Sequence, residues 1–214
     1  MKAPQITNMS TFVHENISWG TLATSMEPLA KIFGSPARLK VLRLFMFNQN
    51  ANLSLVEISG RTRLSGESVR REIVDLVAAG LVRKKGARAA ARYQVNPRFE
   101  HLAALDTFIR ETTSVRPQDI LAALRRAGVP RVIVLSGFFV GVLEAQIDLL
   151  VVGDNLDERA LATAVHSLEA ELGREIRYAS FTTVDFRYRL GVYDRLLRDV
   201  FDYPHRVLID KIGL

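Results

Sequence analysis

Five polar side chains that can hydrogen-bond to a ligand stand close together in one short stretch. They are Ser65, Glu67, Ser68, Arg70 and Arg71. Hydroxyl, carboxylate and guanidinium groups are among the side-chain groups that read base edges in a DNA major groove. Helical spacing places them at the start and on the outer faces of a helix whose other face is apolar. The stretch is therefore a candidate base-reading helix.

A cluster of cations follows shortly afterwards in the chain. Lys84, Lys85, Arg88 and Arg92 belong to a Gly- and Ala-rich loop, predicted for residues 84–92, between two short strand-like runs. Flexible cations in such a loop can meet phosphates or an adjacent minor groove. Segment 61–98 holds 10 basic and 3 acidic residues. A polyanionic partner is the interpretation that this excess favours, and a solvated charged face is the alternative.

Cysteine and histidine, the nitrogen and sulfur ligands of metals, are few. The chain has no cysteine, which excludes disulfides and thiolate metal sites and fits a reducing compartment. The four histidines are scattered without ligand spacing: His14, His101, His166 and His205. We therefore expect no metal held by histidines.

Charge is distributed unevenly along the 214 residues. Residues 1–117 hold 17 Lys+Arg and 9 Asp+Glu, whereas residues 118–214 hold 12 and 14. This asymmetry points to a polyanion partner for the first part only. The longest uncharged apolar run, Val132–Leu143, is too short to cross a bilayer, and no apolar run follows Lys2. We expect a cytoplasmic protein without a membrane partner.

Capping residues and apolar periodicity predict the elements that position these groups. Ser35, Ser54 and Ser65 each precede a helical pattern at the N-cap position. The helix after Ser65 buries Val69 and Ile73 at helical spacing. The later elements of this part are short strands near 81–83 and 92–95 and a helix over 98–111.

The pattern changes after a small, polar, proline-containing stretch at 112–118. Helices then alternate with apolar β-branched strands, which indicates a second unit of α/β type. The predicted elements are a helix at 119–127, strands at 131–136, 147–152 and 175–181, a helix at 156–172 and helices to about 202. The predicted class is a two-domain α+β or α/β chain: an extension of unknown role at 1–25, a first domain at 26–113, a linker at 114–118 and a second domain at 119–214.

Residues 26–113 resemble the winged helix-turn-helix domain of ArsR-like transcriptional regulators. Four motifs carry the resemblance: Leu-Ala-Lys-Ile-Phe-Gly-Ser-Pro-Ala-Arg-Leu-Lys-Val-Leu at 29–42, Leu-Ser-Gly-Glu-Ser-Val-Arg-Arg-Glu-Ile at 64–73, Leu-Val-Ala-Ala-Gly-Leu-Val-Arg-Lys at 76–84 and Ala-Arg-Tyr-Gln-Val-Asn-Pro at 91–97. The resemblance implies that the third helix reads bases and that the wing contacts the DNA backbone.

Residues 131–214 resemble the minimal nucleotidyltransferase domain, which is related to DNA polymerase beta and has a mixed sheet with flanking helices. In that family a Gly-Ser pair holds a phosphate, and an Asp-x-Asp strand holds two magnesium ions. This chain has the reversed pair Ser136-Gly137, and Gln146 stands where the first aspartate of the pair with Asp148 is expected. The third strand offers only Glu175 at its edge. The resemblance thus implies a degenerate, inactive relative in which Ser136, Gly137 and Asp148 remain of a nucleotide pocket.

The sequence favours a DNA-binding transcriptional regulator that binds double-stranded DNA as a homodimer. Its second domain would sense a nucleotide or another small-molecule effector, or serve dimerisation or partner binding. The apolar face of the helix at 98–111 is a candidate dimer seam, and packing within its own domain is the alternative. The competing functions are a magnesium-dependent nucleotidyltransferase, which would need Mg²⁺ as its cofactor, and an antitoxin-like protein-interaction module.

Overall fold

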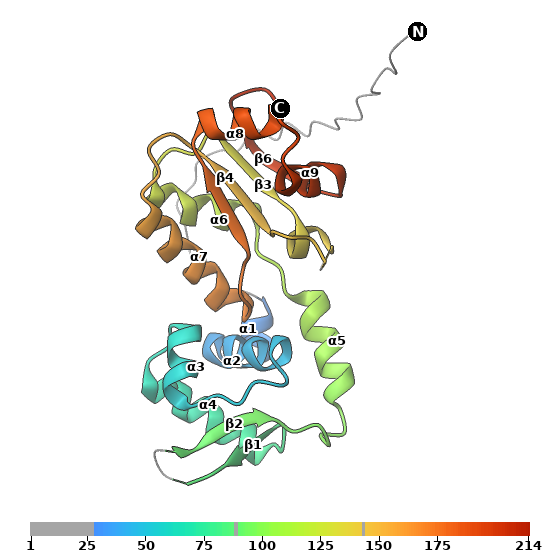
Figure 1. Cartoon of the computed structure of the whole chain (residues 1–214). Helices are drawn as coiled ribbons and strands as arrows, with labels where there is room; N and C mark the ends of the chain where they lie inside the picture. The colour runs from blue at the N-terminus through green and yellow to red at the C-terminus, as the bar shows by residue number, and fades with distance from the viewer. Residues whose placement is uncertain (1–27, 88–89, 143) are drawn as a thin grey trace.

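The computed structural model of the chain describes residues 28–87, 90–142 and 144–214. Within these residues the fold is mixed α and β, with one two-stranded and one four-stranded sheet. Figure 1 shows the sheets toward opposite ends of an elongated molecule, with helix α2 (Pro36–Phe47) between them. We call residues 28–112 the first half and residues 117–214 the second half. None of the described helices combines the length and the apolar character that crossing a bilayer requires.

Three helices of the first half begin where the sequence predicts. Ser35, Ser54 and Ser65 each accept a hydrogen bond from a backbone N–H in the first turn of the following helix. These N–H groups have no partner inside the helix, so the serine caps fix the helix starts. The helices of this half before the hairpin are α1 (Pro28–Ile32), α2 (Pro36–Phe47), α3 (Leu55–Thr62) and α4 (Gly66–Ala78).

Strands β1 (Val82–Lys85) and β2 (Arg92–Val95) form the predicted antiparallel hairpin. Leu53 adds an isolated antiparallel bridge to Tyr93. Strand β2 spans the residues that the sequence predicts, whereas β1 begins one residue later and ends two residues later than predicted, so that Lys84 and Lys85 belong to the strand. The loop predicted for 84–92 is correspondingly shorter.

The helix predicted for 98–111 is α5, which begins only at Leu102 and ends at Thr112. Turns occupy the preceding residues, where the Asn96 side chain accepts a hydrogen bond from the Arg98 N–H and its carbonyl accepts one from the Phe99 N–H. Such local bonds from asparagine compete with helical ones. The helix therefore starts four residues later than its apolar spacing indicates.

The connection between the halves runs from the end of α5 at Thr112 to the start of α6. Helix α6 (Pro117–Leu124) starts with Pro117, because a proline at the first helical position loses no hydrogen bond. A 3₁₀ turn, Arg125–Ala127, follows α6 where the prediction continues the helix. Thr113 is buried, so the connection is packed at its start.

The second half contains a mixed sheet with strand order β5-β4-β3-β6. Strand β4 pairs parallel with β5, whereas β3 pairs antiparallel with β4 and with β6. The elements that follow α6 are β3 (Val132–Leu135), a 3₁₀ turn (Gly137–Val140), β4 (Leu149–Val152), α7 (Glu158–Leu172), β5 (Tyr178–Phe181), α8 (Thr183–Gly191), α9 (Arg195–Asp202) and β6 (Arg206–Asp210). Strand β6 was not predicted from the sequence, and the predicted ranges of the other three strands of this sheet are two or three residues too long.

Both faces of the two central strands are covered. Every residue of β3 and β4 is buried, as the two apolar runs predict. One face packs against α6 and α7 through residues such as Ile133 and Val151. The other face packs against α8 and α9 through residues such as Val134 and Phe186. This two-sided burial holds the residues at the ends of β3 and β4 in fixed positions.

Helix α2 also contacts the second half. The buried Arg43 side chain donates from Nη1 to the Glu171 carbonyl at 3.1 Å and from Nε to Thr113 Oγ1 at 3.1 Å. Lys40 forms an ion pair with the Glu171 carboxylate at 2.6 Å. A buried guanidinium without such partners would be costly, so Arg43 ties α2 to the end of α7.

Gly173 makes the close approach of α2 and α7 possible. It ends α7 at φ +74°, and its carbonyl accepts a hydrogen bond from Asn48 Nδ2 at 2.8 Å. A Cβ atom at this position would collide with the backbone of Arg43 and Leu44. Glycine is therefore required here by both the backbone conformation and the space.

Candidate functional site

The start of α4 presents the residues that the sequence analysis assigned to base reading. Ser65 acts as the N-cap: its Oγ accepts from the Ser68 N–H at 3.2 Å and donates to Ser68 Oγ at 2.9 Å. Both hydroxyls are thus engaged with each other and with the helix start. Their main contribution is to fix the first turn of α4.

Glu67, Arg70 and Arg71 are exposed on α4. Within the described part of the chain, no side-chain hydrogen bond or ion pair engages Arg70 or Arg71. The opposite face of the helix is buried through Val69 and Ile73, as predicted. Two guanidinium groups therefore project from a fixed helix with their hydrogen-bond donors directed to solvent.

The hairpin carries unpaired cations as well. Lys84 and Lys85 are exposed, and neither is in an ion pair with a described residue. In the hairpin register Lys85 stands opposite Arg92, and like charges placed directly across a strand pair are unfavourable. Arg88 lies outside the described residues.

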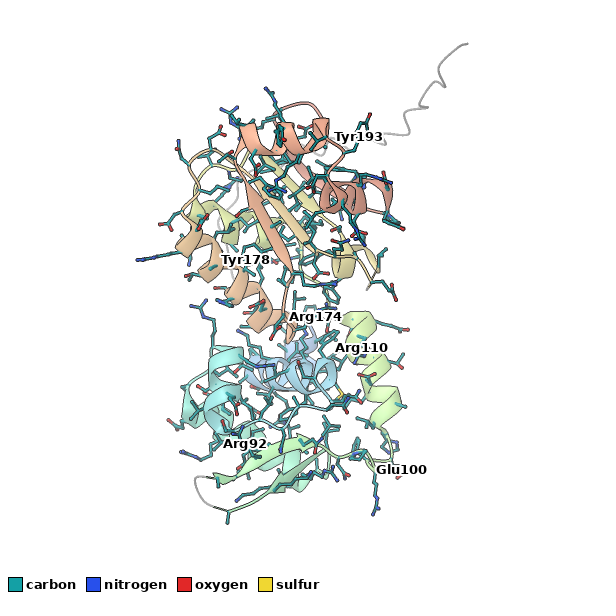
Figure 2. The ribbon with its side chains drawn as sticks, viewed as in Figure 1. Arg92, Glu100, Arg110, Arg174, Tyr178 and Tyr193 are labelled. Atoms are coloured by element: carbon teal, nitrogen blue, oxygen red, sulfur yellow. The ribbon has the colours of Figure 1, made fainter. Side chains whose placement is uncertain are left out.

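Arg92 differs from the two lysines because its charge is already paired. Its guanidinium forms an ion pair with Glu57 and donates to the Asn52 carbonyl at 3.3 Å. Figure 2 labels Arg92 on the hairpin, beside α3. These contacts hold β2 against the start of α3. Arg92 is therefore less available to bind phosphate than Lys84 and Lys85.

A network that the sequence analysis did not identify fixes the orientation of α4. Glu72 is buried: its Oε1 accepts from Ser35 Oγ at 3.0 Å and its Oε2 from Arg38 Nε at 2.8 Å. Arg38 also forms an ion pair with Asp75. The start of α2 is thereby joined to the middle of α4. A charged residue on the buried side of an amphipathic pattern is the signal that points to such a network.

Replacing Glu72 by glutamine tests this network. We expect Glu72→Gln to lower the free energy of unfolding by about 1–2 kcal/mol, because the charge-assisted bond from Arg38 is lost in a buried setting. The measurement is urea denaturation. Glu67→Gln on the same helix is the matched control and should change stability by about 0.5 kcal/mol or less. Equal effects of the two changes would contradict the role given to Glu72.

Ser136, Gly137 and Asp148, which the sequence assigned to a remnant nucleotide pocket, lie together at the end of β3 and the start of β4. Ser136 Oγ donates to the Ile147 carbonyl at 2.7 Å, and the Phe138 N–H donates to Asp148 Oδ1 at 2.8 Å. Gly137 has φ +53°, and a Cβ there would collide with Asp148 Oδ1. The serine and the glycine therefore shape a turn that encloses the aspartate.

Arg177 donates hydrogen bonds to the remaining acceptor positions of the Asp148 carboxylate. The Arg177 N–H and Nε donate to Oδ2 at 3.0 and 3.1 Å, and Nη2 donates to Oδ1 at 3.0 Å. With the Phe138 N–H, four donors reach the two oxygens, which matches the lone-pair capacity of a carboxylate. The Asp148 side chain is only 1% exposed. The carboxylate is thus enclosed and fully hydrogen-bonded within the protein.

The protonation of Asp148 follows from these contacts. Burial alone would raise its pKa, but the hydrogen bonds from Arg177 and Phe138 outweigh burial and hold the pKa below its usual value. Asp148 is therefore ionised at neutral pH. In the described part of the chain no group of three or more His, Asp or Glu side chains is arranged to hold a metal ion.

Comparison of the chain with protein-family models, with curated proteins and with solved structures found no match.

Proposed function

We propose that the protein is a DNA-binding transcriptional regulator. In this proposal residues 26–113 act as a winged helix, with α4 in the major groove and the β1–β2 hairpin as the wing. Residues 119–214 act as a nucleotidyltransferase-like domain without catalytic activity. The observation that carries the proposal is the set of exposed cations on α4 and on β1 that form no ion pair with any described residue, placed on elements whose own caps and packing fix them.

The order of elements supports this assignment. A helix bearing Arg70 and Arg71 follows a tight turn after α3 and precedes a two-stranded hairpin bearing Lys84 and Lys85. Recognition helices contact base edges near their N-terminal ends, where these arginines stand. A protein-docking surface has no need of several unpaired cations on both elements.

The test is salt-dependent binding to double-stranded DNA from upstream of the protein's own gene. The logarithm of the binding constant should fall linearly with the logarithm of the salt concentration, with a slope of roughly 0.9 for each phosphate neutralised. Fluorescence anisotropy between low and physiological salt measures this slope. Affinity that does not change with salt would refute DNA binding.

Replacing Arg70 and replacing Lys84 should affect DNA binding in different ways. We expect Arg70→Ala to cost roughly 1–3 kcal/mol at one base position and to relax the sequence preference there. Lys84→Ala should weaken binding to all sequences alike and reduce the salt slope by about 1. Lys211→Ala, which removes an exposed cation from the second half, is the control. Footprinting on randomised sites distinguishes the two outcomes, and the same loss of selectivity in both variants would refute the division of roles.

The pairing of Asp148 with Arg177 supports a non-catalytic second half. A magnesium-dependent transferase needs carboxylate oxygens open to the metal, whereas both oxygens of Asp148 already accept two hydrogen bonds each. The neighbouring Gln146 offers only a neutral amide. This half would then serve ligand sensing or partner binding rather than nucleotidyl transfer.

The proposed dimer seam on α5 has limited apolar surface left. Ile109 is fully buried, and Leu102 and Leu105 pack against the core of the first half. Phe108 remains 41% exposed, in edge contact with Phe33. Packing within its own half thus accounts for most of the apolar face of α5. A homodimer would need further surface to be stable.

A further inference from the structure

A groove lined by arginines lies where the two halves meet. It has a volume of about 560 Å³, and its charged lining residues are Arg61, Arg110, Arg174, Arg177 and Glu175. Arg61 comes from the end of α3 and Arg110 from α5, whereas Arg174 and Arg177 come from the segment between α7 and β5. We call this hollow the arginine groove. Neither Arg61, Arg110 nor Arg174 belongs to the groups considered above.

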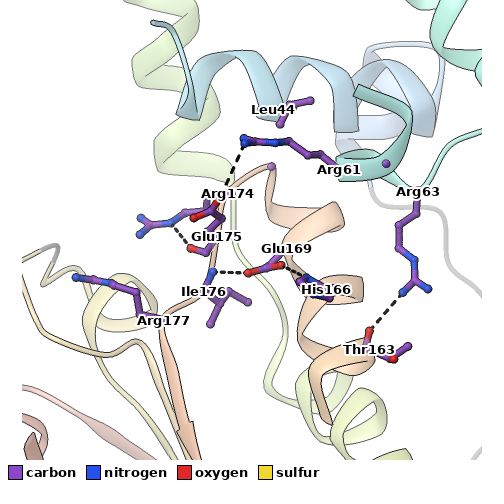
Figure 3. A pocket seen from close by; sticks show the side chains of 12 residues that line it. Leu44, Arg61, Arg63, Thr163, His166, Glu169, Arg174, Glu175, Ile176 and Arg177 are labelled. Atoms are coloured by element: carbon purple, nitrogen blue, oxygen red, sulfur yellow. Dashed lines mark hydrogen bonds and ion pairs between the residues drawn. The ribbon is translucent and has the colours of Figure 1, made fainter. Parts of the chain in front are cut away.

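The four guanidinium groups differ in how strongly other groups of the protein already bind them. Arg177 is held by Asp148, and Arg110 is held by Asp106 and by the Met46 carbonyl. Arg61, in contrast, reaches Glu175 only at 3.9 Å and Asn48 only at 3.5 Å. Figure 3 shows Arg61 extending from α3 toward Glu175, with Arg174 and Arg177 on the facing segment.

Arg174 is the lining arginine whose positive charge has no carboxylate partner among the described residues. Its guanidinium stacks on the Phe138 ring at 4.4 Å, and its Nε donates to the Glu175 carbonyl at 3.3 Å. No carboxylate of the described residues lies within ion-pair distance of it. Burial lowers the pKa of Arg174; the negative charge of Asp148 raises it, but the positive charges of Arg177 and Arg110 add to burial and keep the pKa below its usual value. A half-buried cation flanked by like charges is stabilised when an anion binds.

The surroundings indicate the size and character of the ligand. An adjoining hollow of about 320 Å³ shares Phe47 and Arg110 with the arginine groove. Phe138, Phe139 and Val115 form its apolar lining, and Glu111, Thr113 and Ser114 form its polar lining. Arginines beside aromatic rings suit a molecule that joins an anionic group to an apolar or aromatic body. None of the residues that line the arginine groove comes from the β1–β2 hairpin.

We propose that the arginine groove binds a small phosphorylated molecule, with its phosphate on Arg174 and Arg61 and its apolar body against Phe47 and Phe138. Guanidinium forks bind phosphate oxygens in pairs, and two forks from different segments can share one phosphate. The ligand would contact both halves at once. This site does not depend on DNA binding by α4 and the hairpin.

The experiment titrates the full-length protein, without DNA, with phenyl phosphate, inorganic phosphate and phenol, and follows binding by ³¹P line broadening or thermal stability. Phenyl phosphate should bind more tightly than inorganic phosphate, and phenol should not bind measurably. We expect Arg174→Gln and Arg61→Gln each to weaken phenyl phosphate binding roughly tenfold or more, whereas Arg174→Lys should recover part of the loss.

Arg126→Gln is the matched control, because Arg126 is an exposed arginine that does not line the groove. Its affinity for phenyl phosphate should equal that of the wild type. The proposal is overturned if the wild type shows no phosphate-dependent binding, or if Arg126→Gln weakens binding as much as Arg174→Gln. Denaturation curves of all variants establish that each is folded. Loss of DNA binding would leave these outcomes unchanged, so the two proposals fail separately.

Discussion

Replacing Arg177 by methionine should destabilise the protein by about 3 kcal/mol at neutral pH. Removing one partner of a buried ion pair leaves an uncompensated charge and typically costs about 3–5 kcal/mol. We take the lower end of that range, because the Arg177 side chain is 41% exposed and partly screened by solvent. Asp148 would keep the N–H groups of residues 138 and 177 but lose the guanidinium.

The same change should reverse how Asp148 responds to pH. In the wild type its folded pKa is depressed, so its stabilising contribution is complete above the ordinary aspartate pKa and is lost as pH falls through the lower folded value. Without the guanidinium, burial raises the folded pKa, and the folded variant takes up a proton before the unfolded chain does. The stability deficit of Arg177→Met should therefore shrink as pH falls from 7 toward 4.

Guanidinium denaturation at several pH values measures both effects. Arg198→Met is the matched control: the ion pair between Arg198 and Asp202 is exposed, so its loss should cost about 0.5 kcal/mol or less. Adding Asp148→Asn to Arg177→Met should recover part of the loss, since the unpaired charge disappears. A deficit that does not change with pH would mean that Asp148 is not the group left uncompensated.

Replacing Gly173 by alanine should also have a large effect, of about 3 kcal/mol or more. Part of the cost is the left-handed backbone at φ +74°, which an L-residue adopts at a cost of about 1–2 kcal/mol. The remainder comes from the collision of the new Cβ with the backbone of Arg43 and Leu44. Backbone cannot move aside as a flexible side chain can, so α7 would be displaced from α2.

Gly141 provides the matched control for Gly173. It has φ +82°, but a Cβ there meets no atom within 4 Å. Gly141→Ala should therefore show the backbone cost alone, about 1–2 kcal/mol. Chemical denaturation gives the two values, and limited proteolysis near Ser114 reports separation of the halves. Equal losses in both variants would show that the contact between α2 and α7 is not the source of the effect.

Local signals in the sequence were sufficient for most elements. Ser35, Ser54 and Ser65 satisfy backbone donors only a few residues away, so their caps can be recognised without tertiary information. The two apolar runs that became β3 and β4 were recognised because both of their faces are buried. Strand β6 was missed because it lies at a sheet edge. Arg206 and Val207 are exposed, so β6 has no continuous run of buried apolar residues that would mark it as a strand.

The main contacts at the candidate sites could not be predicted from local sequence patterns, because they join residues that are far apart in the chain. Arg177 meets Asp148 across 29 positions, and Ser35 meets Glu72 across 37. Only the folded sheet and helix packing bring these residues together. The resemblance to nucleotidyltransferases assigned Ser136, Gly137 and Asp148 to one remnant pocket. It did not predict that an arginine would fill the space beside the carboxylate.

The position of β6 has a consequence for folding during synthesis. Strand β3 pairs with both β4 and β6, and β6 is the last strand in the chain. While the ribosome is still making residues 153–205, one long edge of β3 has no strand beside it. The helices and hairpin of the first half are already complete at that stage. The exposed edge of β3 is thus where a nascent chain would be most prone to pair wrongly, and where a chaperone would have most to protect.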